Sequence, residues 1–559
     1  MKRPERTLEQ TLSFRQVIPR WRSPTDALTE VLQHRVASPA PPSQLAEHWL
    51  AEATQRHQST PDLQSARELA EISTMMGSDS PLIVQHPRHE LLADVAPSLN
   101  EALTEIDYSA PTAEEMASNI RRARENIRRY EQQPFAWAEL ARAHISMGHA
   151  KKAKRAMLAA LGGAPRNSYL LRAAARFFTL LDKPEPDRAL WLLRKHGALE
   201  KHPHLLSAEI AIASSENIPT KHARLAEEVL VDKRFSPQQL AELAAAVGTV
   251  EHQNGKHKRA KARFAQSLIN PTENSLAQAY WASQQDSKII IPDRAWDIPR
   301  PHEANAWSYR ETHDYTSVVK ECTAWIRDQP FEITPALLGS YYCTVPSLVS
   351  VAEAIATAGL IAHPRSVGLL NNRAVARIYM GDLTNGLTDI KRAVLEAPND
   401  PHLIATLGLY AFRSGNIEEG RRAYLESALW FKDKRDLASP LLSILHWIRE
   451  ELRIGASIGA EALAELRPHV DKLARTPRGP DVKMIFDLVS QEAAAPAPIV
   501  QPLASLGAAF QLSELDQFKI AIGIPDGIRT AANHLSIATD HRRDQYPTLS
   551  NVRILLNDH

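Results

Sequence analysis

The chain has 559 residues, of which 44% are hydrophobic and 23% are charged, and its formal net charge is +1. A chain of this length exceeds one ordinary hydrophobic core, so several domains or a repeat array are expected. The small net charge excludes a global electrostatic attraction to nucleic acid or to an anionic membrane.

The N-terminal region, 1–110, is predicted to be helical and contains no recognised motif. Ser23 followed by Pro24 is typical of a helix N-cap with proline at the first helical position. The sequence has neither a signal-peptide core nor a run of about 18 apolar residues, so no membrane span is predicted. We therefore expect a cytoplasmic protein, and the composition, rich in alanine and arginine, suggests a bacterial source.

A first array of paired helices is predicted over 111–271. Thr112 and Glu115 have capping-box spacing, which places a helix start there. Ser236 and Gln239 have the same spacing, with Pro237 at the first helical position. Helix-ending prolines recur with spacings of 38, 34 and 34 residues, at Pro165, Pro203, Pro237 and Pro271.

Residues 272–302 break this pattern and are predicted to form a seam between two arrays. The stretch IIIPDRAWDIPRPH contains three prolines and a short β-like apolar run. Tyr280 and Trp281 precede it, and Trp307 and Tyr309 follow it. Because a loose linker is rarely so aromatic, we expect these rings to pack in an ordered segment.

A second array is predicted over 303–434, where the blocks 367–400 and 401–434 superimpose without a gap over 34 residues. A 34-residue period with small residues at fixed offsets resembles the tetratricopeptide repeat, a helix–turn–helix unit. The matched pairs are Gly381 with Gly415, Gly386 with Gly420, Ile390 with Tyr424, and Ala393 with Ser427.

The resemblance implies an all-α fold, a right-handed α-solenoid of such repeats with additional helical terminal regions. Residues 435–491 are predicted to be a helical capping region, because a terminal repeat must cover an exposed apolar face. A linker and C-terminal tail are expected over 492–559. The tail either forms a small helical module or folds back onto the solenoid.

The search for catalytic and metal-binding motifs is negative. The sequence has no G-x-G, no C-x-x-C and no H-E-x-x-H pattern, so no enzyme activity, cofactor or metal is predicted. Cys322 and Cys343 are the only cysteines, so no disulfide framework is expected. Both lie at helix positions that normally face the core, and burial is expected for both.

The resemblance implies binding of a protein or peptide partner in a groove lined by the first helix of each repeat. It fits a non-enzymatic scaffold or regulator, in a bacterial multi-component system. The carboxylate clamp that some members of this family use is matched at one position alone, Asn372. The groove positions predicted to bind the partner are Tyr341, Asn371, Asn372, Val375, Tyr379, His402, Leu409, Phe412 and Arg413.

Tyr379 and Phe412 are expected to act as interface anchors, with Arg413 orienting an acidic group of the partner. The alternative is that both rings pack against neighbouring helices or the C-terminal tail. Two other functions stay open. One is a nucleic-acid-associated regulator that uses the basic helices at 121–129 and 256–263, and the other is an enzyme with its active site in 1–110 or 503–559.

Overall fold

The computed structural model describes residues 15–22, 43–59, 109–129, 134–181, 183–195, 199–343, 348–398, 400–432, 438–455, 459–474, 476 and 478–494. Within these ranges every regular element is a helix, and no strand occurs. The helix expected at Ser23 and the tail 503–559 lie outside the described residues. The chain divides into two units, Met1–Asn305 with Ala324–Phe331, and Ala306–Thr323 with Glu332–His559.

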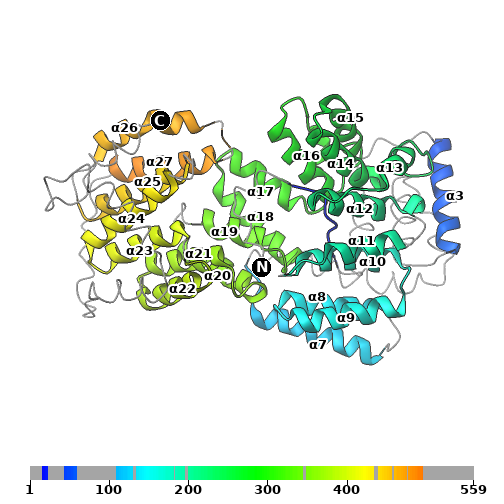
Figure 1. Ribbon diagram of the computed structural model, residues 1–559, viewed down its shortest axis with the longest axis horizontal. Coiled ribbons are helices and arrows are strands. Elements are labelled where there is room, and N and C mark those ends of the chain that lie inside the picture. Colours follow the sequence, from blue (N-terminus) through cyan, green and yellow to red (C-terminus); the bar gives the residue numbers. More distant parts are fainter. Residues whose placement is uncertain are drawn as a thin grey trace. The chain divides into compact units, whose positions relative to one another are not determined.

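The first unit consists of consecutive helix pairs, α8 with α9, α10 with α11, and α14 with α15 (Figure 1). Short 3₁₀ helices lie at Leu199–Lys201 and Asp293–Trp296. The α-helices are α3 (Ser43–Ser59), α7 (Ala113–Arg129), α8 (Pro134–Ser146), α9 (Ala150–Gly163), α10 (Ser168–Leu180), α11 (Pro186–Lys195), α12 (Pro203–Ser215), α13 (Ala223–Leu230), α14 (Pro237–Gln253), α15 (His257–Ser267) and α16 (Glu273–Gln285).

Local sequence explains where several of these helices begin. Both predicted capping boxes form: the Thr112 hydroxyl accepts the Glu115 N–H, and the Glu115 carboxylate accepts the Thr112 N–H. Ser236 and Gln239 make the same reciprocal pair at the start of α14. These bonds satisfy N–H groups that have no partner inside the helix.

The predicted seam is partly helical, because α16 occupies 273–285. The β-like run forms no strand, and Ile290 within it is exposed. Tyr280 packs edge-on against Trp296 with ring centroids 5.8 Å apart, as expected for aromatics in an ordered segment.

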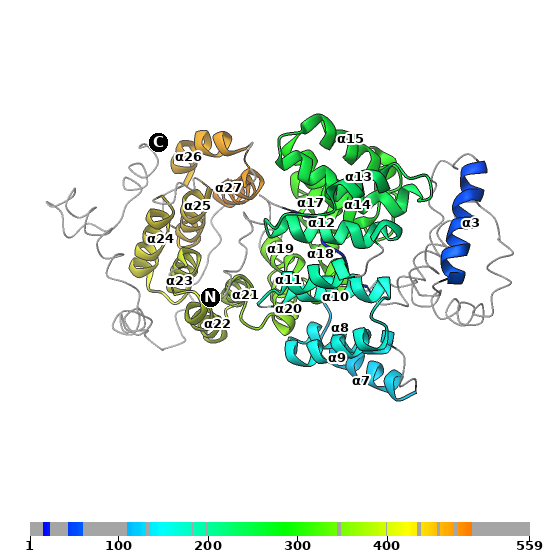
Figure 2. The ribbon, with the colours of Figure 1, turned by 45° about the vertical axis from the view of Figure 1, so that its right-hand side comes forward.

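The second unit repeats the pairing, with α19 against α20, α21 against α22, and α23 against α24 (Figure 2). Helices α17 and α18 contribute residues to both units. The helices are α17 (His302–Glu311), α18 (Tyr315–Asp328), α19 (Thr334–Tyr342), α20 (Val349–Ala362), α21 (Val367–Tyr379), α22 (Leu383–Glu396), α23 (Pro401–Arg413), α24 (Ile417–Lys432), α25 (Ala438–Arg453), α26 (Gly459–Leu473) and α27 (Gly479–Ala494).

The aligned glycines have two separate roles in this unit. Gly381 and Gly415 turn the chain between paired helices with φ of +84° and +87°, a conformation that glycine adopts without strain. At Gly420 a Cβ atom would lie 2.4 Å from the Phe412 ring, so only glycine allows the two helices to approach. The prediction of an all-α array of tetratricopeptide-like repeats is confirmed.

Both cysteines are buried and unbonded, as expected. Burial raises the pKa of the Cys343 thiol to about 12, and it also raises the pKa of the Cys322 thiol well above its usual range. Among the described residues, no helix is both long and apolar enough to cross a membrane.

Candidate partner-binding faces

In each unit, the surface formed by the first helix of every pair is here called the first-helix face. In the second unit α19, α21, α23 and α25 form this face, and the predicted partner-binding residues lie on the first three of these helices or at their ends. In the first unit α8, α10, α12, α14 and α16 form it.

Two predicted polar residues of the second unit connect neighbouring first helices. The Asn372 amide donates to the Leu337 carbonyl at 3.2 Å and to the Ser340 hydroxyl at 2.9 Å. The Asn371 amide oxygen accepts from the Thr406 hydroxyl at 2.7 Å. These hydrogen bonds hold α21 against α19 and α23, so both side chains already have partners within the array.

Leu409 and Phe412 are buried within the array. They are 3% and 5% exposed. The Phe412 ring packs inside its own helix pair, against Gly420 and 6.0 Å from the Tyr424 ring. Phe412 is therefore a core residue, because Gly420 has no side chain and α24 can approach closely enough to cover the ring.

Val375 and Tyr379 are half-buried, whereas His402 is exposed. The His402 ring lies against Phe431 with centroids 4.8 Å apart, and its Nδ1 atom lies 2.8 Å from the Asp400 carboxylate. Of the predicted set, His402 has the greatest exposure.

Tyr379 lies at the centre of three arginines rather than beside one. The guanidinium carbons of Arg413, Arg449 and Arg453 are 5.1, 5.2 and 5.3 Å from its ring centroid. The Arg449 guanidinium also donates to the Tyr379 hydroxyl at 3.3 Å. Burial raises the pKa of this phenol to about 12, although Arg449 opposes the shift. Cations over the ring face stabilise the cluster without a partner.

Carboxylates of the same unit balance these arginines. Arg413 Nε lies 2.8 Å from a Glu450 oxygen, and burial raises the pKa of that carboxyl while Arg413 opposes the change. Arg449 and Arg453 both reach Glu492, at 2.9 and 3.4 Å. Arg413 thus already pairs with an acidic group of this chain, Glu450 of α25, whereas the sequence prediction concerned an acidic group of a partner.

Helix α27 packs against α25 and α26 (Figure 1). At its start, Asp481 accepts from Arg310 of α17 and from the Tyr342 hydroxyl of α19. Near its end, Glu492 pairs with Arg449 of α25. Its covered side chains are Val482, Met484, Ile485, Phe486 and Val489. The alternative that Tyr379 packs against neighbouring helices describes the structure.

Sequence reasoning missed the segment 15–22, which lies on the first-helix face of the first unit and is neither helix nor strand. Val17 is fully buried, and Trp21 is 1% exposed. The indole of Trp21 lies edge-on to Phe177 and tilted against Phe331, with centroids 6.1 and 5.6 Å away. Short segments without a periodic apolar pattern give no signal for such docking.

Three arginines of this segment meet three carboxylates. Arg15 donates to both oxygens of Glu303, at 2.7 and 2.8 Å, and Arg20 donates to the second of these oxygens. Arg22 lies 3.5 Å from Glu273 and 3.4 Å from Asp328. Burial alone raises the pKa of a carboxyl, but Arg15 and Arg20 hold that of Glu303 at about 2.

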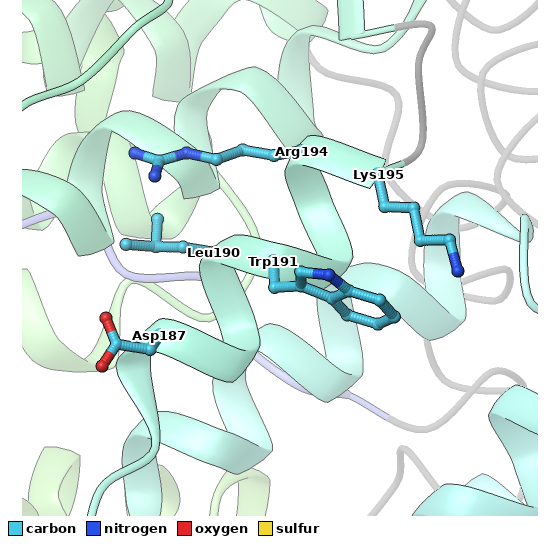
Figure 3. Close-up of a pocket in the computed structure, with 5 residues that line it drawn as sticks. All are labelled: Asp187, Leu190, Trp191, Arg194 and Lys195. Atoms are coloured by element: carbon cyan, nitrogen blue, oxygen red, sulfur yellow. The ribbon is translucent and has the colours of Figure 1, made fainter.

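A pocket elsewhere in the described residues gives weaker evidence for a functional site. A shallow pocket is lined by Asp187, Leu190, Trp191, Arg194 and Lys195, all from α11 alone (Figure 3). Trp191 is 56% exposed there, and the Lys195 ammonium lies 4.6 Å from its ring centroid. One helix provides no set of converging groups for chemistry.

A histidine cluster and a basic helix also stand out in the first unit. His252, His257 and Asp286 offer ligand atoms within 4.8 Å of one another, but His257 is largely exposed. On the predicted basic helix 256–263, Arg259 and Arg263 both pair with Glu227. Their charge is thus partly neutralised, which does not favour a nucleic-acid surface.

Comparison with known proteins gives structural likeness only. No protein-family model and no curated protein matches the sequence. Among solved structures, the chain is similar to yeast Tom70 (TM-score 0.28, 12% identity, 80% of this chain and 96% of that chain covered). It is also similar to the APC/C hetero-tetramer Cut9-Hcn1 (0.30, 14%, 87% and 96%) and to Naa15/Naa10 bound to HypK-THB (0.21, 10%, 80% and 80%). At these TM-scores, the fold assignment rests on the helix pairs themselves.

Proposed function

We propose that this protein is a non-enzymatic scaffold or regulator that binds a protein or peptide partner through its first-helix faces. One observation carries the proposal: the first unit already holds a non-helical segment, residues 15–22, along this face. The segment lies between 121 and 288 residues from the groups that bond it. Binding of one stretch of chain by side chains of a distant array is the same contact that a partner would make.

A bacterial multi-component assembly in the cytoplasm remains the expected setting, from composition and the shortage of cysteine. No group of side chains in the described residues favours catalysis over binding. The carboxylates and arginines that converge on either face pair with one another, and such pairing stabilises structure rather than activating a nucleophile.

The test begins with partner capture by the full chain, identification by mass spectrometry, and reconstitution of the complex from purified components. Hydrogen exchange then locates the contact surface. We expect slowed exchange in first helices, such as α8, α10 and α16 or α19, α21 and α23. Protection confined to second helices, such as α9, α15 and α22, would refute binding through the first-helix faces.

A matched pair of variants tests the second unit separately. Tyr379→Ala should weaken binding of the reconstituted partner by about 5- to 100-fold if the ring is an anchor. Leu395→Ala removes an apolar side chain that is 75% exposed on α22, so it should leave the affinity unchanged. Equal affinities for both variants would remove Tyr379 from the binding surface.

A further inference from the structure

We propose that the first-helix face of the first unit is a receptor for a non-helical, arginine-rich peptide, and that a partner segment of this chemistry takes the place of residues 15–22. The ligand is defined by its occupant: two arginines five residues apart, then an aromatic residue and a third arginine. This inference rests on the proposed function and adds the chemistry of the partner.

Charge on the face defines the first requirement for a ligand. Glu303 and Asp328 have side chains that are 12% and 6% exposed, and Glu273 is 12% exposed. Removing a cation from a buried carboxylate costs several kcal/mol, because the remaining charge has no solvent to replace it. Any segment that displaces residues 15–22 must therefore bring its own positive charges to these positions.

Hydrogen bonds from side chains of the face to the backbone of residues 15–22 define the second requirement for a ligand. Four main-chain carbonyls of the segment accept hydrogen bonds from side chains of α8, α10 and α16, and none of these bonds depends on which residue the peptide carries. Gln278 donates to Arg15, Asn274 to Ile18, Arg142 to Trp21, and Tyr169 to Arg22. Such contacts recognise the peptide backbone, and the sites that hold the peptide's side chains determine which residues bind.

The slot for Trp21 supplies selectivity between side chains. It is built from Phe177 and Phe331, and the indole is almost fully buried. Within the described part of the chain, the buried indole N–H has no acceptor. The slot therefore recognises an aromatic ring by shape, so phenylalanine should replace tryptophan in a ligand with little loss.

The occupant competes with a partner because it is covalently attached. A tethered segment acts at an effective concentration of about millimolar, which weakens the apparent affinity of a free peptide. Cutting the tether converts the occupant into an ordinary ligand. Peptide binding to the face can then be tested in the cleaved protein, which keeps all of its residues and stays folded.

The experiment uses the full chain with a protease site inserted between Ala37 and Pro42, at the proline-rich stretch 38–42. After cleavage of the folded protein, a fluorescent synthetic peptide of residues 12–24, LSFRQVIPRWRSP, is added and its anisotropy is measured. We expect weak binding to the uncut protein and binding at least tenfold tighter after cleavage. Cleaved protein that stays folded but does not bind or exchange the peptide would overturn the proposal.

Peptide variants separate recognition from general charge attraction. A scrambled peptide of the same composition should bind at least tenfold more weakly, as should one with all three arginines replaced by alanine. A peptide with Trp21→Phe should bind within a few fold of the original. Equal binding of the scrambled peptide would mean that the face attracts any cation and is not a receptor.

Two glutamate variants of the same unit provide the protein control. Glu303→Gln should weaken peptide binding at least tenfold, because this carboxylate receives both Arg15 and Arg20. Glu209→Gln changes a fully buried glutamate that pairs with Arg194, away from the segment, and should leave binding unchanged. Equal losses in both variants, each with wild-type circular dichroism, would refute the assignment.

The outcomes also separate this inference from the proposed function. Failure of peptide exchange, with a partner still protecting first helices elsewhere, would reject the peptide receptor and keep the scaffold. A dimer that forms on concentration and is lost with Trp21→Ala would show that the ligand is the segment of a second copy, which would overturn the assignment to a different protein.

Discussion

Replacing Asp481 with alanine should loosen helix α27 in the second unit. Asp481 is fully buried, and its partner Arg310 is 1% exposed. The guanidinium lies 3.1 Å from the carboxylate, and Tyr342 donates a further hydrogen bond to it. Removing one partner of a buried ion pair costs about 3–5 kcal/mol, since the other charge stays buried.

The lower end of that range applies here. After the substitution, Arg310 still reaches the Tyr342 hydroxyl at 2.6 Å and Glu311 at 2.7 Å. A loss of about 3 kcal/mol corresponds to about a 100-fold increase in the open population. Hydrogen exchange by mass spectrometry should therefore show peptides of 482–492 exchanging about 100-fold faster, provided that they exchange through opening of α27.

Asp487→Ala on the same helix is the matched control. Asp487 is 47% exposed and pairs with Lys483 across one turn, so its loss should cost less than about 0.5 kcal/mol. Replacing Arg310 and Asp481 together with Met and Leu should restore most of the stability, because no buried charge is left. Equal exchange rates in the two aspartate variants would refute the reasoning.

Three further predictions follow from single sites. The pKa of Glu303 is about 2 in the folded state against 4.5 ordinarily, so the stability that its ionised form contributes is present above pH 4.5 and is lost as the pH falls towards 2. Thermal melting over this pH range should show a loss of about 3 kcal/mol in the wild-type protein, and this loss should be absent in Glu303→Gln. Cys322 and Cys343 should resist a thiol reagent in the native protein and react fully in denaturant, and fast native labelling would contradict their burial. Gly420→Ala should destabilise by about 1–3 kcal/mol in denaturant unfolding, whereas Gly162→Ala, whose Cβ would meet nothing within 4 Å, should be neutral or stabilising.

Local patterns predicted the repeats well. The 34-residue alignment paired Gly381 with Gly415 and Gly386 with Gly420, and the structure has turns at the first pair and a tight helix contact at Gly420, each of which depends on residues a few positions apart. Capping boxes at Thr112 and Ser236 were predictable for the same reason. Periodicity reports which face of a helix is apolar, and this information is local.

The occupied faces were not predictable in the same way. The pairs of Arg15 with Glu303 and of Arg310 with Asp481 join residues 288 and 171 positions apart. Nothing in either neighbourhood distinguishes these charges from solvated ones. Tyr379 lies on α21, a first helix, and its three arginine neighbours come partly from α25, outside the aligned repeats.

The docking of residues 15–22 has a consequence for synthesis. Most repeat arrays can fold as they emerge, since each unit contacts only its neighbours. Here residues 15–22 dock against Glu303, Asp328 and Phe331, which lie at the end of the unit and are translated after them. At about 5–20 residues per second, the segment waits about 15–60 s for its site. Within the first unit, residues 15–22 therefore complete their fold only after the last residues of the unit have been made.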